Sequence, residues 1–134
     1  IPLVSIIDAT AEAIEREGLR RVGLLGTLFT MTRDFYREGL ARRGIEVVTP
    51  SREDMELVDR VIFEELVNGV LKPESKKEFL RIIGELERMG ARGVILGCTE
   101  IPLLVSQEDV SIKLFDTARI HAEKALELAL GGSR

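Results

Sequence analysis

Cysteine is almost missing from this chain of 134 residues, which has a single thiol at Cys98. One cysteine can form neither an intramolecular disulfide nor a zinc site built from several thiolates. This excludes the disulfide-rich secreted domains, and we predict a cytoplasmic protein without a bound metal. Two interpretations of Cys98 remain open: a small buried apolar side chain, or a reactive group.

The chain also lacks any concentration of charge of one sign. Its 19 basic and 23 acidic residues are interspersed along the sequence and give a net charge of −4. Because no basic stripe follows a phosphate backbone, we expect no nucleic-acid partner. No apolar run approaches the roughly 20 residues of a membrane span, and no segment has the pattern of a signal peptide. We therefore expect no membrane partner.

Four short runs rich in valine, isoleucine and leucine are present, separated by longer segments in which apolar residues have helical spacing. The runs are residues 22–25, 46–48, 93–96 and 112–115. Such alternation predicts a doubly wound α/β fold, with a four-stranded, mainly parallel sheet flanked by helices. A chain of this length buries enough apolar surface to fold as one domain, here residues 1–134.

Local signals mark where the helices begin and end. Ser51-x-x-Asp54 and Ser75-x-x-Glu78 resemble capping boxes, whose side chains satisfy backbone donors at a helix N-terminus. Two of the helical segments have a regular apolar face. These faces comprise Met55, Val58, Ile62 and Leu66 in one segment, and Phe79, Ile82 or Ile83, Leu86 and Met89 in the other. The glycines predicted to end helices are Gly44, Gly69, Gly90 and Gly131.

In sheets of this kind, ligands bind beyond the carboxyl ends of the strands. The first strand runs into Gly26-Thr27-Leu28-Phe29-Thr30-Met31-Thr32, ahead of a helix predicted to begin near Arg33. Either these hydroxyls and backbone N–H groups form an anion cradle, or Thr30 or Thr32 caps the helix. The segment lacks both the third glycine of a dinucleotide fingerprint and the GK[ST] ending of a phosphate-binding loop, so nucleotide binding is not predicted.

The third strand ends in Leu96-Gly97-Cys98-Thr99-Glu100-Ile101-Pro102. We expect a short helix directly after Cys98, whose positive end would lower the pKa of the thiol. Gly97 permits close approach of a substrate, and Thr99 can donate a hydrogen bond to it. These neighbours favour the reactive interpretation of Cys98.

The fourth strand ends in Phe115-Asp116-Thr117, and the helix after it contains His121, the only histidine of the chain. Asp116 or Thr117 is predicted to be the N-cap of this helix. His121 has three interpretations: it orients a ligand, it partners the thiol, or it has a structural role in the helix.

With these strand ends in hand, the chain resembles the aspartate/glutamate racemase superfamily in three segments. They are Leu24-Leu25-Gly26-Thr27-x-x-Thr30-Met31, Gly97-Cys98-Thr99-Glu100-Ile101-Pro102-Leu103 and Phe115-Asp116-Thr117-x-x-x-His121. Gly-Cys-Thr-Glu is typical of the aspartate racemase branch, whereas glutamate racemases usually have histidine after the threonine. The resemblance covers essentially the whole chain.

Members of this superfamily are isomerases that need no cofactor, built from two similar α/β halves that each contribute one cysteine to the site between them. One thiolate removes the α-proton of the bound amino acid, and the opposed thiol delivers a proton to the other face. The resemblance thus implies an acidic amino acid as substrate. We also expect a homo-oligomer such as a dimer, because one half of such a site would expose an apolar surface that pairs with itself. The catalytic residue so implied is Cys98. The substrate-binding residues are Thr99, Thr27 and Thr30, and the supporting residues are Glu100 and His121.

The sequence departs from this family in one respect. The Cys-Asn-Thr motif that ends the family's first half has no match here. Ile1-Pro2-Leu3-Val4-Ser5-Ile6 resembles the segment that follows that motif, so we expect residues 1–134 to be the carboxyl-terminal domain of a racemase, with the amino-terminal half absent. Some aspartate racemases place a lysine near the position of residues 65–69, where this chain has none before Lys72. Strict aspartate specificity is therefore not predicted.

Two alternatives to a racemase remain open. In the first, the chain is an inactive or self-associating half-domain that acts as a binding or structural module, paired with the amino-terminal half or a second copy. In the second, Cys98 is the nucleophile of a thiol enzyme with His121 as base. A receiver-type signalling domain is excluded, because the first strand ends without an acidic cluster to hold magnesium.

Overall fold

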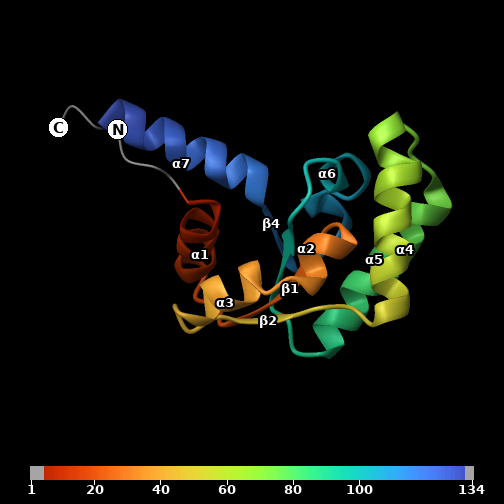
Figure 1. The fold of residues 1–134 in the computed structure, drawn as a ribbon, viewed down its shortest axis with the longest axis horizontal. Coiled ribbons are helices and arrows are strands. Elements are labelled where there is room, and N and C mark those ends of the chain that lie inside the picture. Colours follow the sequence, from red (N-terminus) through yellow and green to blue (C-terminus); the bar gives the residue numbers. More distant parts are fainter. Residues whose placement is uncertain (1–4, 132–134) are drawn as a thin grey trace.

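The computed structural model describes residues 5–131, so the segment Ile1-Pro2-Leu3-Val4 quoted above lies outside the described residues. Helices and strands alternate along the chain (Figure 1). The helices are α1 Ile6–Arg16, α2 Leu28–Thr32, α3 Phe35–Ala41, α4 Arg52–Glu64, α5 Pro73–Arg88, α6 Ile101–Leu104 and α7 Thr117–Gly131, with 3₁₀ turns η1 Leu66–Asn68 and η2 Gln107–Asp109. The strands are β1 Arg21–Leu25, β2 Glu46–Val48, β3 Gly93–Leu96 and β4 Lys113–Asp116.

The four strands form one parallel sheet in the order β2-β1-β3-β4, which confirms the predicted α/β fold. Each predicted strand lies within one residue of the observed one. In the register, Leu25 lies beside Leu96, and Leu96 lies beside Asp116. The strand order reverses direction between β1 and β3, and this is the point at which sheets of this type bind ligands.

Helices cover both faces of the sheet (Figure 1). α1 and α3 lie on one face, with α7 packed against α1, while α4 and α5 lie on the other. On that second face, α5 comes so close to β1 that a Cβ on Gly23 would lie 2.8 Å from a methyl of Leu86. Glycine in the middle of β1 therefore permits the close packing of α5 on the sheet.

One of the two helix starts predicted from capping motifs is confirmed, and the other is wrong. Ser51 is the N-cap of α4, and its hydroxyl accepts a hydrogen bond from the Asp54 N–H at 3.2 Å. The prediction for Ser75 is wrong, because α5 begins at Pro73. Proline suits the first position of a helix, where a backbone N–H has no partner within the helix. The buried Ser75 hydroxyl donates to the Glu65 carboxylate instead, at 2.6 Å.

The apolar faces predicted for α4 and α5 are buried in the core with two exceptions. Met55 is only half-buried, and Met89 is 47% exposed, because it follows the last residue of α5 rather than lying on its inner face. The buried members are Val58, Ile62 and Leu66, and Phe79, Ile82, Ile83 and Leu86.

Three of the four glycines predicted to end helices do so. Gly44, Gly69 and Gly90 have positive φ angles, a conformation that favours glycine. The prediction for Gly131 is wrong, since Gly131 is the last residue within α7. None of the helices within residues 5–131 has both the length and the apolar character that crossing a bilayer requires.

Candidate functional site

Two polar loops meet where the strand order reverses. Thr27 follows β1, and Cys98 follows β3, which pairs with β1. The Gly97 N–H donates to the Leu25 carbonyl oxygen at 2.7 Å, so the loop before Cys98 continues the pairing of the two strands. The sheet therefore delivers a thiol and a hydroxyl to the same edge.

The first loop contains a helix that the sequence did not predict. The helix predicted to begin near Arg33 is α3, which begins at Phe35, and the additional helix α2 precedes it, separated from it by Arg33 and Asp34. Thr27 is the N-cap of α2, and its hydroxyl accepts a hydrogen bond from the Thr30 N–H at 3.2 Å. The prediction of Thr30 or Thr32 as the cap is therefore wrong.

Thr27 and Thr30 form a pair of hydroxyls beside the second loop. Their Oγ1 atoms lie 3.1 Å apart. A Cβ on Gly97 would lie 3.4 Å from the Thr30 methyl group, and a Cβ on Gly26 would lie 3.1 Å from it. The missing side chain of Gly26 therefore leaves room for Thr30, and the Thr30 methyl group borders Gly97, the residue that precedes Cys98.

The N-terminus of α2 is held by a residue of α4. The Leu28 N–H donates to Oδ1 of Asp59 at 2.7 Å, in a half-buried position. Asp59 and Thr27 thus accept hydrogen bonds from two of the backbone N–H groups of the predicted anion cradle. These two N–H groups are not available to bind an anion. Sequence reasoning missed Asp59, although an acidic residue between Val58 and Ile62 on an apolar face was a usable signal.

Cys98 is half-buried at the start of the second loop. Burial raises the pKa of its thiol above the ordinary value, and the Glu100 carboxylate raises this pKa further. Backbone N–H groups of Glu100 and Ile101 act in the opposite direction, as expected for the start of a helix. The prediction of a lowered pKa is therefore wrong, because desolvation outweighs the contribution of the four-residue helix α6.

The neighbours of Cys98 are polar at its carboxyl side. The exposed Thr99 hydroxyl donates to the carboxylate of Glu100, which is the N-cap of α6. Thr99 was predicted to donate a hydrogen bond to a substrate, and its hydroxyl here donates to a side chain of the protein instead. The carboxylate also keeps negative charge close to the thiol.

The end of β4 supports the second loop from the other side. The Asp116 carboxylate accepts a hydrogen bond from the Arg119 N–H at 3.2 Å, which confirms the prediction that Asp116 caps the last helix. Thr117 is buried and donates its hydroxyl proton to the Leu96 carbonyl oxygen. Burial raises the pKa of the buried Tyr36 hydroxyl, and the Thr117 side chain lowers this pKa by a smaller amount. Tyr36, on α3, was not predicted, and nothing in its local sequence indicates this contact.

The remaining predicted residue, His121, is half-buried in α7, five residues after Asp116. No group of three or more histidine, cysteine or carboxylate side chains among residues 5–131 is arranged to hold a metal ion.

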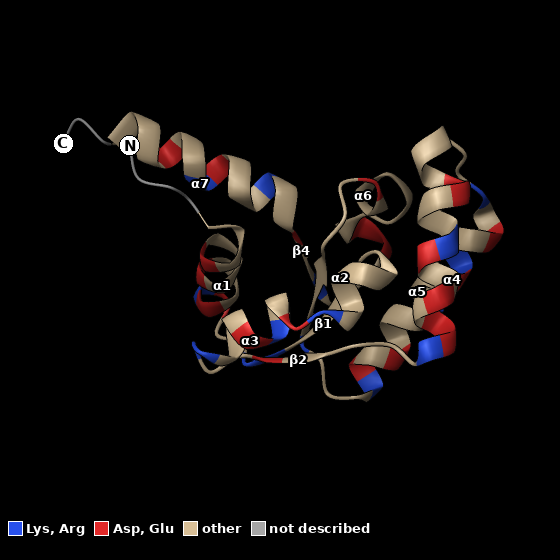
Figure 2. Ribbon diagram, viewed as in Figure 1, with Lys and Arg blue, Asp and Glu red and all other residues tan. Residues whose placement is uncertain are grey.

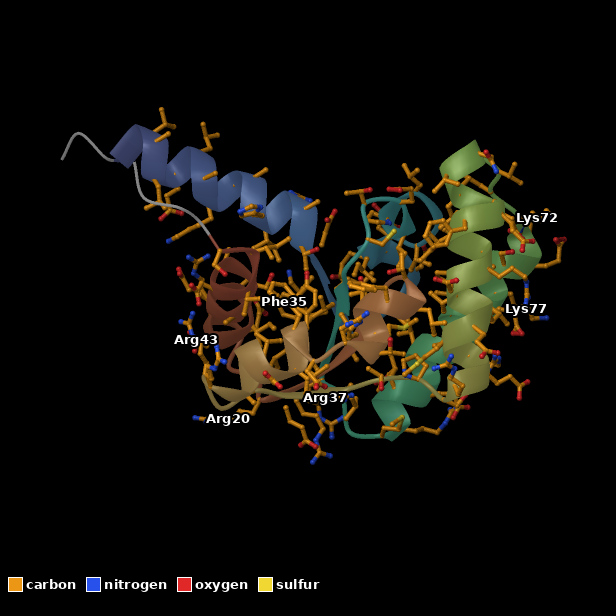
Figure 3. All side chains as sticks on the ribbon, in the orientation of Figure 1. Arg20, Phe35, Arg37, Arg43, Lys72 and Lys77 are labelled. Carbon is orange, nitrogen blue, oxygen red and sulfur yellow. The ribbon has the colours of Figure 1, made fainter. Side chains whose placement is uncertain are left out.

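The two short helices of the site loops contain no charged residue, although Glu100 directly precedes α6 and Arg33 directly follows α2. Figure 2 shows acidic and basic residues mixed along α4 and α5, whereas α2 and α6 contain none. Lys72 lies near the start of α5, far from α7 (Figure 3), and its Nζ is 3.9 Å from the Glu65 carboxylate. The site is thus made of hydroxyls, a thiol and backbone groups, with Asp59 and Glu100 as its nearest carboxylates on these contacts.

Comparison with known proteins identifies similar sequences and folds. The family model described as Asp/Glu/Hydantoin racemase matches residues 1–125. An aspartate racemase homologue from Pyrococcus horikoshii OT3 is 52% identical, with a TM-score of 0.91 over 96% of this chain and 57% of that one. A glutamate racemase from Streptococcus gordonii is 29% identical over 107 residues, which are 79% of this chain and 39% of that enzyme.

The fold similarity extends to more distant sequences. A glutamate racemase from Francisella tularensis, whose crystal structure contains D-glutamate, is 18% identical with a TM-score of 0.71 over 99% of this chain and 49% of that one. The chain therefore spans between 39% and 57% of the length of these three proteins.

Proposed function

The chain belongs to the Asp/Glu/hydantoin racemase family, and we propose that it supplies one part of the active site of a cofactor-independent racemase of acidic amino acids. In this proposal Cys98 is an acid/base at the α-carbon of the substrate. The observation that carries the proposal is that the loop of Thr27 and Thr30 lies beside Gly97, the residue before Cys98, at the reversal of strand order.

The chemistry requires two groups on opposite faces of the α-carbon. A thiolate on one face takes the α-proton, which breaks the Cα–H bond and forms S–H. A thiol on the other face gives its proton to the carbanion, which forms the new Cα–H bond with inverted configuration. Because burial and Glu100 raise its pKa, Cys98 is held in the thiol form near neutral pH, which is the proton-donating form.

The hydroxyls have the complementary role in this proposal. Removal of the α-proton places negative charge on the α-carbon and its carboxylate, and donors aimed at that carboxylate stabilise the developing charge. Thr27 and Thr30 supply two hydroxyls from one side of the site, and we assign them to the carboxylate. Thr99 joins them when a substrate replaces its hydrogen bond to Glu100.

The second acid/base cannot come from these residues, because the chain has only one cysteine. We assign it to a segment outside residues 1–134, or to a second copy of the chain. An apolar rim beside the site supports a covering partner of either kind. This rim comprises Phe29, Phe63, Val67 and Leu103, which are 65%, 56%, 47% and 59% exposed.

The rim also supports a second candidate function, a self-associating half-domain. Two of its residues are on α2 and α6, the helices that follow the site loops, and the other two are on α4 and η1, which contact those helices. Sedimentation at micromolar concentration is expected to detect dimers of the 134-residue chain in this case. A chain that is purely monomeric contradicts this second candidate.

Chiral chromatography of aspartate and glutamate tests the proposed racemase. If the second thiol comes from a segment outside residues 1–134, we expect the 134-residue chain alone to racemise neither amino acid at a substantial rate, since it has one thiol. If it comes from a second copy of the chain, we expect the specific activity of the 134-residue chain to rise with its concentration. The complete product of the reading frame that encodes it is expected to racemise at least one of them without added cofactor. Substantial racemisation by the 134-residue chain that is unchanged in Cys98→Ser would contradict the proposal.

A further inference from the structure

We propose that Asp59 is a positioning residue for this site. Asp59 holds the Thr27 and Thr30 hydroxyls in the position where they contact a substrate beside Cys98. The inference rests on the proposed racemase function. It adds a residue from a distant helix, α4, that belongs to none of the strand-end segments.

The helix α2 cannot hold its own position. It has five residues, which is too short for an isolated helix to be stable. Every helix begins with backbone N–H groups that have no partner within the helix. In α2, two of these are satisfied by side chains: Thr30 N–H by Thr27, and Leu28 N–H by Asp59.

Thr27 and Asp59 differ in what their hydrogen bonds fix. Thr27 precedes α2 directly, so its hydrogen bond shapes the turn but does not tie it to the rest of the protein. Asp59 lies 31 residues away in sequence, on a helix whose neighbouring residues Val58 and Ile62 are buried in the core. Its bond to Leu28, at 2.7 Å, is of the charge-assisted kind, which is stronger than a neutral hydrogen bond.

The bond from Leu28 to Asp59 anchors α2 next to the hydroxyl pair of the site. Leu28 lies directly after Thr27 and two residues before Thr30, so the anchor acts on the residues that carry the hydroxyl pair. Thr30 packs on Gly97, which fixes the other side of the pair against the loop of Cys98. The anchored α2 therefore lies between a carboxylate on α4 and the backbone before the thiol, and movement at either contact displaces the hydroxyls.

A set of variants of the complete reading-frame product tests the inference. Asp59→Ala removes the acceptor, and Asp59→Asn keeps an oxygen acceptor but removes the charge. Glu56→Ala is the matched control, because Glu56 is also a carboxylate of α4 but pairs with Arg52 at an exposed position. Hydrogen exchange of the Leu28 amide and steady-state racemisation kinetics are measured for each variant.

We expect Asp59→Ala to accelerate exchange of the Leu28 amide and to raise KM about tenfold, the size of effect that loss of one charged hydrogen bond produces. Asp59→Asn is expected to restore KM to within about threefold of the wild-type value. Glu56→Ala is expected to match the wild type in both measurements.

Two results would overturn the inference. One is an unchanged rate of Leu28 amide exchange in Asp59→Ala. The other is faster exchange with unchanged KM, which would make Asp59 a helix cap without influence on the substrate. Failure of the racemase proposal would be recognised by a different result, namely equal racemisation by the wild type and Cys98→Ser. That result does not depend on any variant of Asp59.

Discussion

Thr117 donates its hydroxyl proton to the carbonyl oxygen of Leu96 across 3.1 Å, at a point fully enclosed in the protein. The bond joins the first residue of α7 to the last residue of β3, two residues before Cys98. The Thr117 side chain also acts on the buried Tyr36 hydroxyl of α3, whose pKa burial raises and Thr117 lowers. Three elements therefore meet at the strand end that carries the thiol.

The buried bond from Thr117 to Leu96 predicts a loss of stability when it is removed. Thr117→Val takes the side-chain donor away from the Leu96 carbonyl oxygen, and is expected to lower the free energy of unfolding by about 1–3 kcal/mol. Tyr36→Phe leaves the Leu96 bond intact, so a loss of only about 1 kcal/mol is expected. Urea unfolding monitored by circular dichroism measures both. Thr117→Ser is the control, and a Thr117→Val protein as stable as this control would rule out the predicted role.

The opposite effect is expected at Thr10 in α1. Its side chain is completely buried, and within residues 5–131 its Oγ1 has no hydrogen-bond partner. Valine has nearly the same shape without the hydroxyl, so Thr10→Val is expected to raise the free energy of unfolding by about 1 kcal/mol. The same unfolding measurement applies, and a less stable Thr10→Val protein would show that the hydroxyl has a partner after all.

Glu100 offers a test of the electrostatics at the thiol. Its carboxylate raises the pKa of Cys98, so Glu100→Gln is expected to lower this pKa and to speed alkylation of Cys98 by iodoacetamide at pH 7.5. Burial still acts on the thiol, and its pKa is expected to remain above the ordinary value. The pH profile of alkylation measures the shift. Glu108→Gln, an exposed substitution on η2, is the control. Identical pH profiles for the two variants would show that the Glu100 carboxylate does not raise the pKa of Cys98.

Thr30 separates packing from hydrogen bonding at the proposed substrate contact. Thr30→Val keeps the methyl group that packs on Gly97 but removes the hydroxyl, whereas Thr30→Ser does the reverse. In the complete reading-frame product, Thr30→Val is expected to raise KM about tenfold and Thr30→Ser by much less. If instead Thr30→Ser has the larger effect, the role of Thr30 is to pack the loop rather than to contact the substrate.

The fold was predictable because its strands are continuous apolar runs between regular helices. Both faces of β3 are covered, so all four residues from Gly93 to Leu96 are buried and the run is conspicuous in the sequence. The start of α5 was not predictable from its local motif. Ser75 has the spacing of a cap, but Pro73 already begins the helix, and a carboxylate from Glu65 takes the hydroxyl.

The candidate site was predictable only where it follows the ends of strands. The positions of Thr27, Cys98 and Asp116 follow from the parallel sheet, since its carboxyl ends share one edge. The position of α2 does not follow from the sheet, because its Leu28 N–H is held by Asp59, which lies 31 residues away on α4. The direction of the Cys98 pKa shift also requires the structure: a sequence shows the helix that follows the thiol, but not the burial that outweighs it.

The central claim is that Cys98 is one of two acid/base groups on opposite faces of the α-carbon. NMR of deuterium incorporation at Cα tests it most directly, with L- and D-aspartate and L- and D-glutamate incubated separately in D₂O with the complete reading-frame product. For Cys98→Ser, we expect inversion to be lost for both enantiomers, and exchange without inversion to survive for at most one of them, through the remaining group. Inversion of either enantiomer by Cys98→Ser at the wild-type rate would contradict the claim.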